Sequence, residues 1–100
     1  MRLSELFREV EFDGSIKNDA DINLVTDDSR LVRPGSLFVC IRHRSFDGHT
    51  AAVDALASGA AAVVTQDRLG LENELRVADS RSAYARFVRH SVITRSASSE

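Results

Sequence analysis

The sequence predicts an α/β fold, a single small domain with a mixed sheet of about four to five strands flanked by helices. Apolar runs of strand length alternate along the chain with segments whose apolar residues recur at helical spacing. The length, 100 residues, is enough for one domain and not for two. We assign this domain to residues 1–92 and expect a serine-rich, disordered tail over residues 93–100.

The first half of the chain predicts one helix and then two strands. The apolar residues of the helix recur at i, i+3, i+4 and i+7: Leu3, Leu6, Phe7 and Val10. A short strand is expected over residues 22–26. The nearly continuous apolar run over residues 36–41 is typical of a strand covered on both faces. Between them, Pro34 and Gly35 predict a type II turn, because Pro34 fixes φ and Gly35 tolerates a positive φ.

The second half predicts a helix, two strands and a final helix. Gly59 follows residues of helical spacing and is expected to end that helix. Strands are expected over residues 61–65 and 75–78. The last helix is capped by Asp79 or Ser80 in this interpretation, and its core-facing residues are Tyr84, Phe87 and Val88.

Composition and charge exclude several classes of protein. The net charge of −2 gives no general attraction to nucleic acid or to an anionic membrane. No stretch approaches the ~20 apolar residues of a membrane span, and the N-terminus lacks the apolar segment of a secretory signal. Cys40 is the single cysteine, so no internal disulfide is possible, and we interpret it as a core residue. We therefore expect a cytoplasmic protein.

Polar segments follow two of the predicted strands, at residues 27–30 and 42–46. In open α/β sheets, ligands bind beyond the carboxyl ends of the strands, so these loops could share one binding edge. Ser29 offers a hydroxyl group beside loop amides, Arg44 offers charge for a phosphate, and Phe46 offers a flat face for a base. The spacing is therefore compatible with a nucleotide site.

Purely structural roles are the alternative interpretation of the same residues. Asp28 and Arg30 are spaced so that they could pair and fix their loop, although Arg30 could also supply charge to a phosphate. Phe46 could equally pack its loop against the core. The spacing of these residues leaves both interpretations open.

Catalytic and metal-binding roles are not predicted. His43, Asp47 and His49 lie close together in sequence, but no serine or cysteine accompanies them at a recognisable spacing, and they match no common zinc pattern. We expect His49 to lie at the start of the following helix. The sequence has no Gly-x-x-x-x-Gly-Lys-Ser/Thr loop, so ATP hydrolysis by this chain alone is not expected.

Four motifs occur in order within roughly residues 1–90. They are Thr-Asp-Asp-Ser-Arg at 26–30, Pro-Gly-Ser-Leu-Phe-Val at 34–39, Phe-Asp-Gly-His at 46–49 and Ser-Gly-Ala-Ala-Ala-Val-Val at 58–64. In content and spacing they resemble the N-terminal domain of Mur ligases, in particular the MurE branch. A ligase of the MurF type is a further alternative.

The resemblance implies a function that composition and spacing alone do not. MurE ligases are cytoplasmic, require ATP and Mg²⁺, and add the third amino acid to UDP-N-acetylmuramoyl-L-alanyl-D-glutamate in peptidoglycan biosynthesis. This serves cell wall formation, cell shape and cell division. The N-terminal domain holds the UDP end of the substrate, whereas other domains bind ATP and the incoming amino acid. The resemblance thus implies a substrate-binding domain that is not catalytic alone, carries no cofactor, and works with the remaining ligase domains.

The family pattern also assigns roles to individual residues. The contacts with the UDP moiety would fall on Asp27, Ser29, Arg44, Ser45 and Phe46. Asp28 and Arg30 would fix the loop. Two positions depart from the pattern, since His43 stands where the family usually has glycine and Asp27 where it usually has an apolar or small residue. These departures support a second hypothesis, a free-standing interaction module that has kept the fold and lost UDP binding.

Overall fold

The computed structural model describes residues 2–8, 10–16, 19–42, 47–90 and 94–95. Its strands are β1 (Leu24–Thr26), β2 (Ser36–Val39), β3 (Ala62–Thr65), β4 (Glu74–Arg76) and β5 (Thr94–Arg95). Its helices are α1 (Leu3–Leu6), α2 (Ala52–Ala57) and α3 (Ser80–His90), with two short 3₁₀ helices, η1 (Ser29–Leu31) and η2 (Gly48–Ala51). The predicted α/β class and number of strands are confirmed.

The five strands form one sheet in the order β4-β3-β2-β1-β5, and every pairing between them is parallel. The prediction of a mixed sheet is therefore wrong for the described residues. The strands are parallel because each connection carries the chain back to the same end of the sheet before the next strand begins, which is what a crossover connection does. The antiparallel contacts in the described residues are isolated bridges, which pair Arg2 with Asp21, Arg42 with Asp47, and Asp13 with Arg76 at the end of β4.

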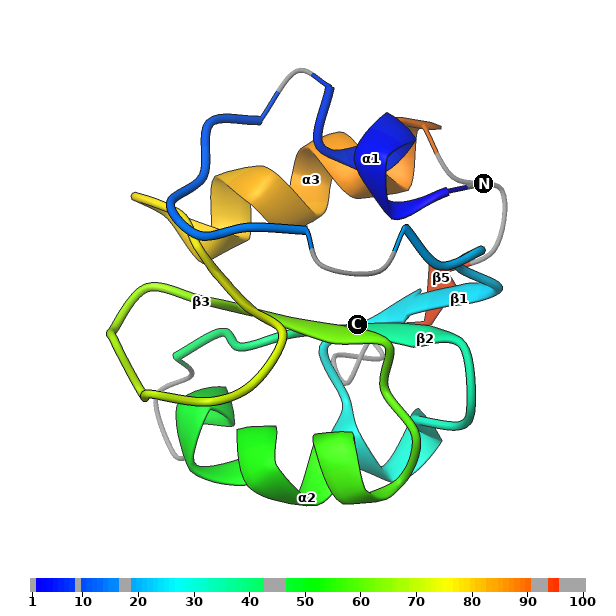
Figure 1. Ribbon diagram of the computed structural model, residues 1–100, viewed down its shortest axis with the longest axis vertical. Helices are drawn as coiled ribbons and strands as arrows, with labels where there is room; N and C mark the ends of the chain where they lie inside the picture. The colour runs from blue at the N-terminus through cyan, green and yellow to red at the C-terminus, as the bar shows by residue number, and fades with distance from the viewer. Residues whose placement is uncertain (1, 9, 17–18, 43–46, 91–93, 96–100) are drawn as a thin grey trace.

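The first four strands are added in one direction, and α3 then carries the chain back across the sheet. It brings β5 against the free side of β1, where Val25 pairs with Thr94. Figure 1 shows α1 and α3 on one face of the sheet and α2 on the other. The domain is therefore a three-layer α/β structure with β2 and β3 fully enclosed.

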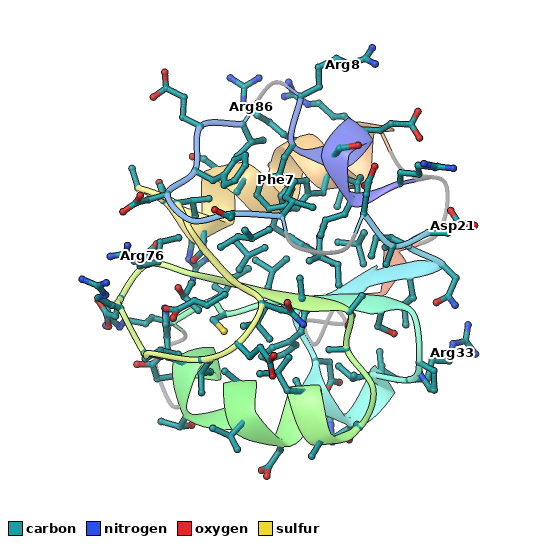
Figure 2. All side chains as sticks on the ribbon, viewed as in Figure 1. Phe7, Arg8, Asp21, Arg33, Arg76 and Arg86 are labelled. Carbon is teal, nitrogen blue, oxygen red and sulfur yellow. The ribbon has the colours of Figure 1, made fainter. Side chains whose placement is uncertain are left out.

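The core lies on both faces of the sheet, as the continuous apolar run of β2 predicted. Leu37 packs with the α1 and α3 side, whereas Phe38 packs with the α2 side, because successive side chains of a strand point to opposite faces. Phe7 and Phe87 join α1 to α3 with their ring centroids 5.0 Å apart. Figure 2 shows Phe7 directed inward and Arg8 directed away from the protein.

The two predicted glycine signals are confirmed. Gly35 has a φ of 88° in the turn before β2, and Gly59 has a φ of 107° immediately after α2. The amide of Gly59 donates to the carbonyl oxygen of Leu56 at 3.1 Å, which satisfies one of the last carbonyls of the helix. These positive φ values explain why glycine stands at each position.

Three details differ from the sequence prediction. The first helix ends at Leu6, although Phe7 is buried and Val10 packs partly against the core. Val88 is 41% exposed, because the core-facing side of α3 is formed by Ala83 and Phe87. The final two described residues, which fall in the predicted tail, pair with β1 as strand β5. The position of the domain boundary stays a prediction.

Candidate functional site

The loop that follows β1 has a shape fixed by its own polar groups. The hydroxyl oxygen of Thr26 accepts from the amide of Asp28 at 3.0 Å. One carboxylate oxygen of Asp28 accepts from the amide of Arg30 at 2.9 Å and from its Nε at 3.0 Å, and the other accepts from a terminal guanidinium nitrogen at 2.8 Å. The Arg30 side chain lowers the pKa of the Asp28 carboxyl despite its burial. The pairing that the sequence suggested is thus present.

Two predicted ligand contacts belong to this loop, and they differ in exposure. Ser29, the first residue of η1, is partly exposed at the carboxyl end of β1. Asp27 is only 3% exposed, so its carboxylate presents little surface to a ligand in this structure. The loop therefore offers the Ser29 hydroxyl more readily than the Asp27 side chain.

The loop that follows β2 is closed at its base. The amide of Gly48 donates to the carbonyl oxygen of Ile41 at 2.9 Å, and Arg42 Nε donates to an Asp47 oxygen at 3.1 Å. Arg42 also pairs with Asp67, which lies beyond the end of β3. Between these anchors the predicted ligand contacts Arg44, Ser45 and Phe46, together with His43, lie outside the described residues. The structure thus fixes the base of the second loop.

A buried histidine lies beside that base. His49 is the second residue of η2, as predicted, and its side chain is only 4% exposed. Its Nδ1 lies 2.7 Å from an Asp47 oxygen, and its Nε2 accepts from the amide of Gln66 at 2.9 Å. Although burial opposes ionisation of Asp47, hydrogen bonds from His49 and Arg42 lower its pKa to about 2. The Asp47 carboxylate therefore stays ionised at neutral pH, paired with Arg42.

Sequence reasoning missed two polar residues of this edge. The side-chain oxygen of Gln66 accepts from both the amide and the hydroxyl of Ser80, at 2.8 and 3.1 Å. Gln66 directly follows β3, so the rule that selected the segments after β1 and β2 would have found it. The carboxylate of Glu74 accepts from Thr65 Oγ1 at 2.9 Å and from the amide of Leu69 at 2.8 Å. No sequence signal distinguishes Glu74 from an exposed strand residue.

The described part of the chain contains no group of three or more histidine, cysteine or acidic side chains that could hold a metal ion. The thiol of Cys40 is buried, and burial together with the charges of Asp47 and Glu74 raises its pKa to about 12. It therefore stays protonated and is a poor nucleophile. The described residues therefore offer no acidic cluster for Mg²⁺, and the sequence has no Gly-Lys-Ser/Thr loop to hold the phosphates of ATP.

Within the same described residues, no helix has the length and apolar character needed to cross a membrane. The longest, α3, has 11 residues, and a membrane-spanning helix needs about 20.

Comparisons of the sequence with family models and with known proteins point to the same family. The model of the family described as "Mur ligase family, catalytic domain" matches residues 21–98. The UDP-N-acetylmuramoyl-L-alanyl-D-glutamate–2,6-diaminopimelate ligase of Listeria monocytogenes is 34% identical over 87 residues. The ligase of the same name from Syntrophomonas wolfei is 38% identical over 91 residues. Each alignment covers 85% of this chain, and the chain spans 18% of the length of each relative.

Solved structures give the same fold. The MurF ligase of Thermotoga maritima, determined in complex with ADP, is similar with a TM-score of 0.64 and 27% identity, over 73% of this chain and 17% of that one. MurF of Acinetobacter baumannii is similar with a TM-score of 0.68 and 22% identity, over 88% of this chain and 20% of that one. At 22% identity, the similarity to the Acinetobacter baumannii structure shows the fold alone.

Proposed function

This chain belongs to the Mur ligase family, and we propose that it holds the uridine-diphosphate end of a UDP-N-acetylmuramoyl-peptide. Its sequence relatives are named for adding 2,6-diaminopimelate to UDP-N-acetylmuramoyl-L-alanyl-D-glutamate, which is the MurE reaction of peptidoglycan biosynthesis. Because this chain spans 18% of their length, the proposal is limited to substrate binding. The ligation chemistry is not assigned to it.

The arrangement of β1 and β2 carries the proposal. The two strands are parallel neighbours, with Val25 opposite Leu37, so the loops that follow them leave the same edge of the sheet. This edge is where nucleotides bind in open α/β sheets. In the first loop the Asp28–Arg30 pair holds the backbone around Ser29, and this partly exposed residue is available to a ligand in the proposal.

We further propose the division of roles at this site. The Ser29 hydroxyl and the Arg44 guanidinium bind the diphosphate, Ser45 adds a hydrogen bond, and Phe46 lies against the base. Asp27, being buried, contributes to the shape of the first loop rather than to direct contact.

ATP and Mg²⁺ are assigned in this proposal to other ligase domains, because the sequence has no Gly-Lys-Ser/Thr phosphate loop and the described residues hold no acidic cluster for the metal. Those domains would be its partners, and the site of action would be the cytoplasm. The proposal includes no nucleic acid and no membrane as a partner, in keeping with the low net charge of −2.

Nuclear magnetic resonance with a ¹⁵N-labelled chain tests the proposal directly. Titration with UDP-N-acetylmuramoyl-L-alanyl-D-glutamate up to millimolar concentration should shift the amides of Ser29 and of residues 44–46. Replacing Ser29 by alanine should weaken binding roughly tenfold, because a hydrogen bond to a charged group is lost. Ser58→Ala is the matched control, since Ser58 is exposed and precedes β3 at the opposite edge of the sheet.

Shifts confined to residues far from this edge, or none at millimolar ligand, would contradict substrate binding. That outcome would favour the second hypothesis, an interaction module that has lost UDP binding. Equal affinity of Ser29→Ala and Ser58→Ala would contradict the role of Ser29 while leaving the site in place.

A further inference from the structure

The loop that carries Ser29 is joined to the sheet through one hydroxyl group. Thr26 is the last residue of β1, where it pairs with Phe38 of β2 and with Arg95 of β5, and it is fully buried. Its hydroxyl oxygen accepts from the amide of Asp28 at 3.0 Å. Because strands on both sides fix the position of Thr26, this bond fixes the start of the loop relative to the sheet.

Two turns of the same kind follow each other in this loop. The Thr26 hydroxyl accepts from the amide two residues ahead, that of Asp28. The Asp28 carboxylate in turn accepts from the amide two residues further on, that of Arg30, at 2.9 Å. Ser29 lies inside the second turn, between the two residues of the ion pair. The position of Ser29 therefore depends on Asp28, and the position of Asp28 depends on Thr26.

Thr26 can act on a ligand only through its neighbours. It is fully buried, so its hydroxyl does not reach a ligand in this structure. Asp28 is 7% exposed, so water has little access to its amide when the hydroxyl is removed. Leaving a buried amide without an acceptor costs more than the net value of an ordinary hydrogen bond. Loss of the Thr26 hydroxyl should therefore displace the backbone at Asp28 toward another acceptor, and Ser29 with it.

We infer that Thr26 is a positioning residue for Ser29, and that its hydroxyl raises the affinity of the site for the UDP end without touching the ligand. The inference rests on the proposed function. Because the effect passes through Ser29, removal of the Thr26 hydroxyl should weaken binding no more than removal of the Ser29 hydroxyl does. Once Ser29 is replaced by alanine, the Thr26 hydroxyl should have little further effect on affinity.

A double-mutant cycle measures this coupling. Calorimetry compares the affinity for UDP-N-acetylmuramoyl-L-alanyl-D-glutamate of the wild type, Thr26→Val, Ser29→Ala and the double variant. Thr26→Val keeps the branched shape of the side chain and removes the hydroxyl, and it should bind roughly tenfold more weakly than the wild type. The double variant should bind within about twofold of Ser29→Ala. Thr26→Ser keeps the acceptor of the Asp28 amide and should recover most of the affinity that Thr26→Val loses.

Ser36→Ala is the matched control for the loss of a buried hydroxyl. The Ser36 side chain is also fully buried, and its hydroxyl oxygen accepts from the backbone amide of Arg33 at the same distance, 3.0 Å. Ser36 begins β2 and pairs with the first residue of β1, so it lies at the opposite edge of the sheet from the Ser29 loop. Ser36→Ala should lose stability to urea, as Thr26→Val does, and should bind the ligand as tightly as the wild type.

Hydrogen exchange of the wild-type chain tests the geometry without any substitution. The amide of Asp28 belongs to a loop, yet it should exchange much more slowly than in the unfolded chain, because it is bonded to a buried hydroxyl oxygen. The same amide should exchange faster in Thr26→Val. An unprotected Asp28 amide in the wild type would overturn the inference even if Thr26→Val failed to fold.

The outcomes separate this inference from the function on which it rests. No binding by the wild type would refute the proposed function. If the wild type binds, unchanged affinity of Thr26→Val would refute the role of Thr26 alone, as would losses from Thr26→Val and Ser29→Ala that add in the double variant. Equal weakening by Ser36→Ala would point to a general loss of stability and would overturn the inference as well.

Discussion

Gly48 is the position where a single added methyl group should disturb both the fold and the candidate site. A Cβ atom there would lie 2.9 Å from the nitrogen and 3.0 Å from the oxygen of Ile41, and 3.3 Å from the Cα of Cys40. All three are backbone atoms just beyond the end of the central strand β2, so they cannot move aside like the tip of a side chain. Replacement by alanine should therefore force the base of the second loop away from the sheet.

The size of the effect follows from two opposing contributions. Overpacking against a fixed backbone costs about 3 kcal/mol, at the upper end of the usual range. Alanine also restricts the unfolded chain more than glycine does, which returns about 0.7 kcal/mol of stability. The free energy of unfolding should thus fall by about 2 kcal/mol, which corresponds to a melting temperature roughly 10 °C lower for a domain of this size.

Gly70→Ala provides the matched comparison, because Gly70 has a φ of 72° but nothing within 4 Å of an added Cβ. It carries conformational strain without a clash, so its stability loss should be about 1 kcal/mol, clearly less than that of Gly48→Ala. Urea unfolding followed by circular dichroism measures both variants. The reasoning about Gly48 is refuted if Gly48→Ala is as stable as Gly70→Ala.

Three further predictions concern the core and two titrating groups. Phe87→Ala should lower the free energy of unfolding by about 4 kcal/mol, whereas Val88→Ala should change it by no more than ~0.5 kcal/mol. Urea titration of the two variants measures the difference. Asp47 is ionised in the fold with a pKa of about 2, against an ordinary value of 3.8, so its stabilisation is present above pH 4. After allowance for the partial exposure of Asp47, the free energy of unfolding should fall by about 1 kcal/mol as the pH falls from 4 to 2. The stability of Asp47→Asn, measured over the same acid range, should not show this fall. The Cys40 thiol, with its pKa raised to about 12, should not react with an aromatic disulfide at pH 8 until urea unfolds the chain; rapid reaction in the folded state would contradict its burial.

Much of the layered fold could be predicted because the relevant signals are local. The continuous apolar run over residues 36–41 indicated a strand covered on both faces, and the structure buries Leu37 and Phe38 on opposite sides. Gly35 and Gly59 marked a turn and a helix end, since few other residues tolerate their positive φ. The parallel direction of all strands was missed, because it depends on how the connections return across the sheet.

The candidate site was predictable only in part, for a similar reason. The pairing of Asp28 with Arg30 joins residues two apart in sequence, and the spacing alone suggested it. The bond between His49 and Gln66 joins a residue of η2 to the residue that follows β3, so it appears only once these two elements are packed together. The segment 43–46, which the family resemblance assigned to the ligand, lies outside the described residues, and its role stays a prediction.

The pairing of β1 with β5 has a consequence for how the protein acquires its binding edge during synthesis. β1 is made before the other four strands of this sheet, yet one side of it stays open until Thr94 and Arg95 have been made. An unpaired strand edge is a template for incorrect association, and contacts between distant residues slow folding. The strand that carries the Ser29 loop therefore depends on a segment made much later to enclose its second side, and removal of Thr94 and Arg95 should expose its backbone.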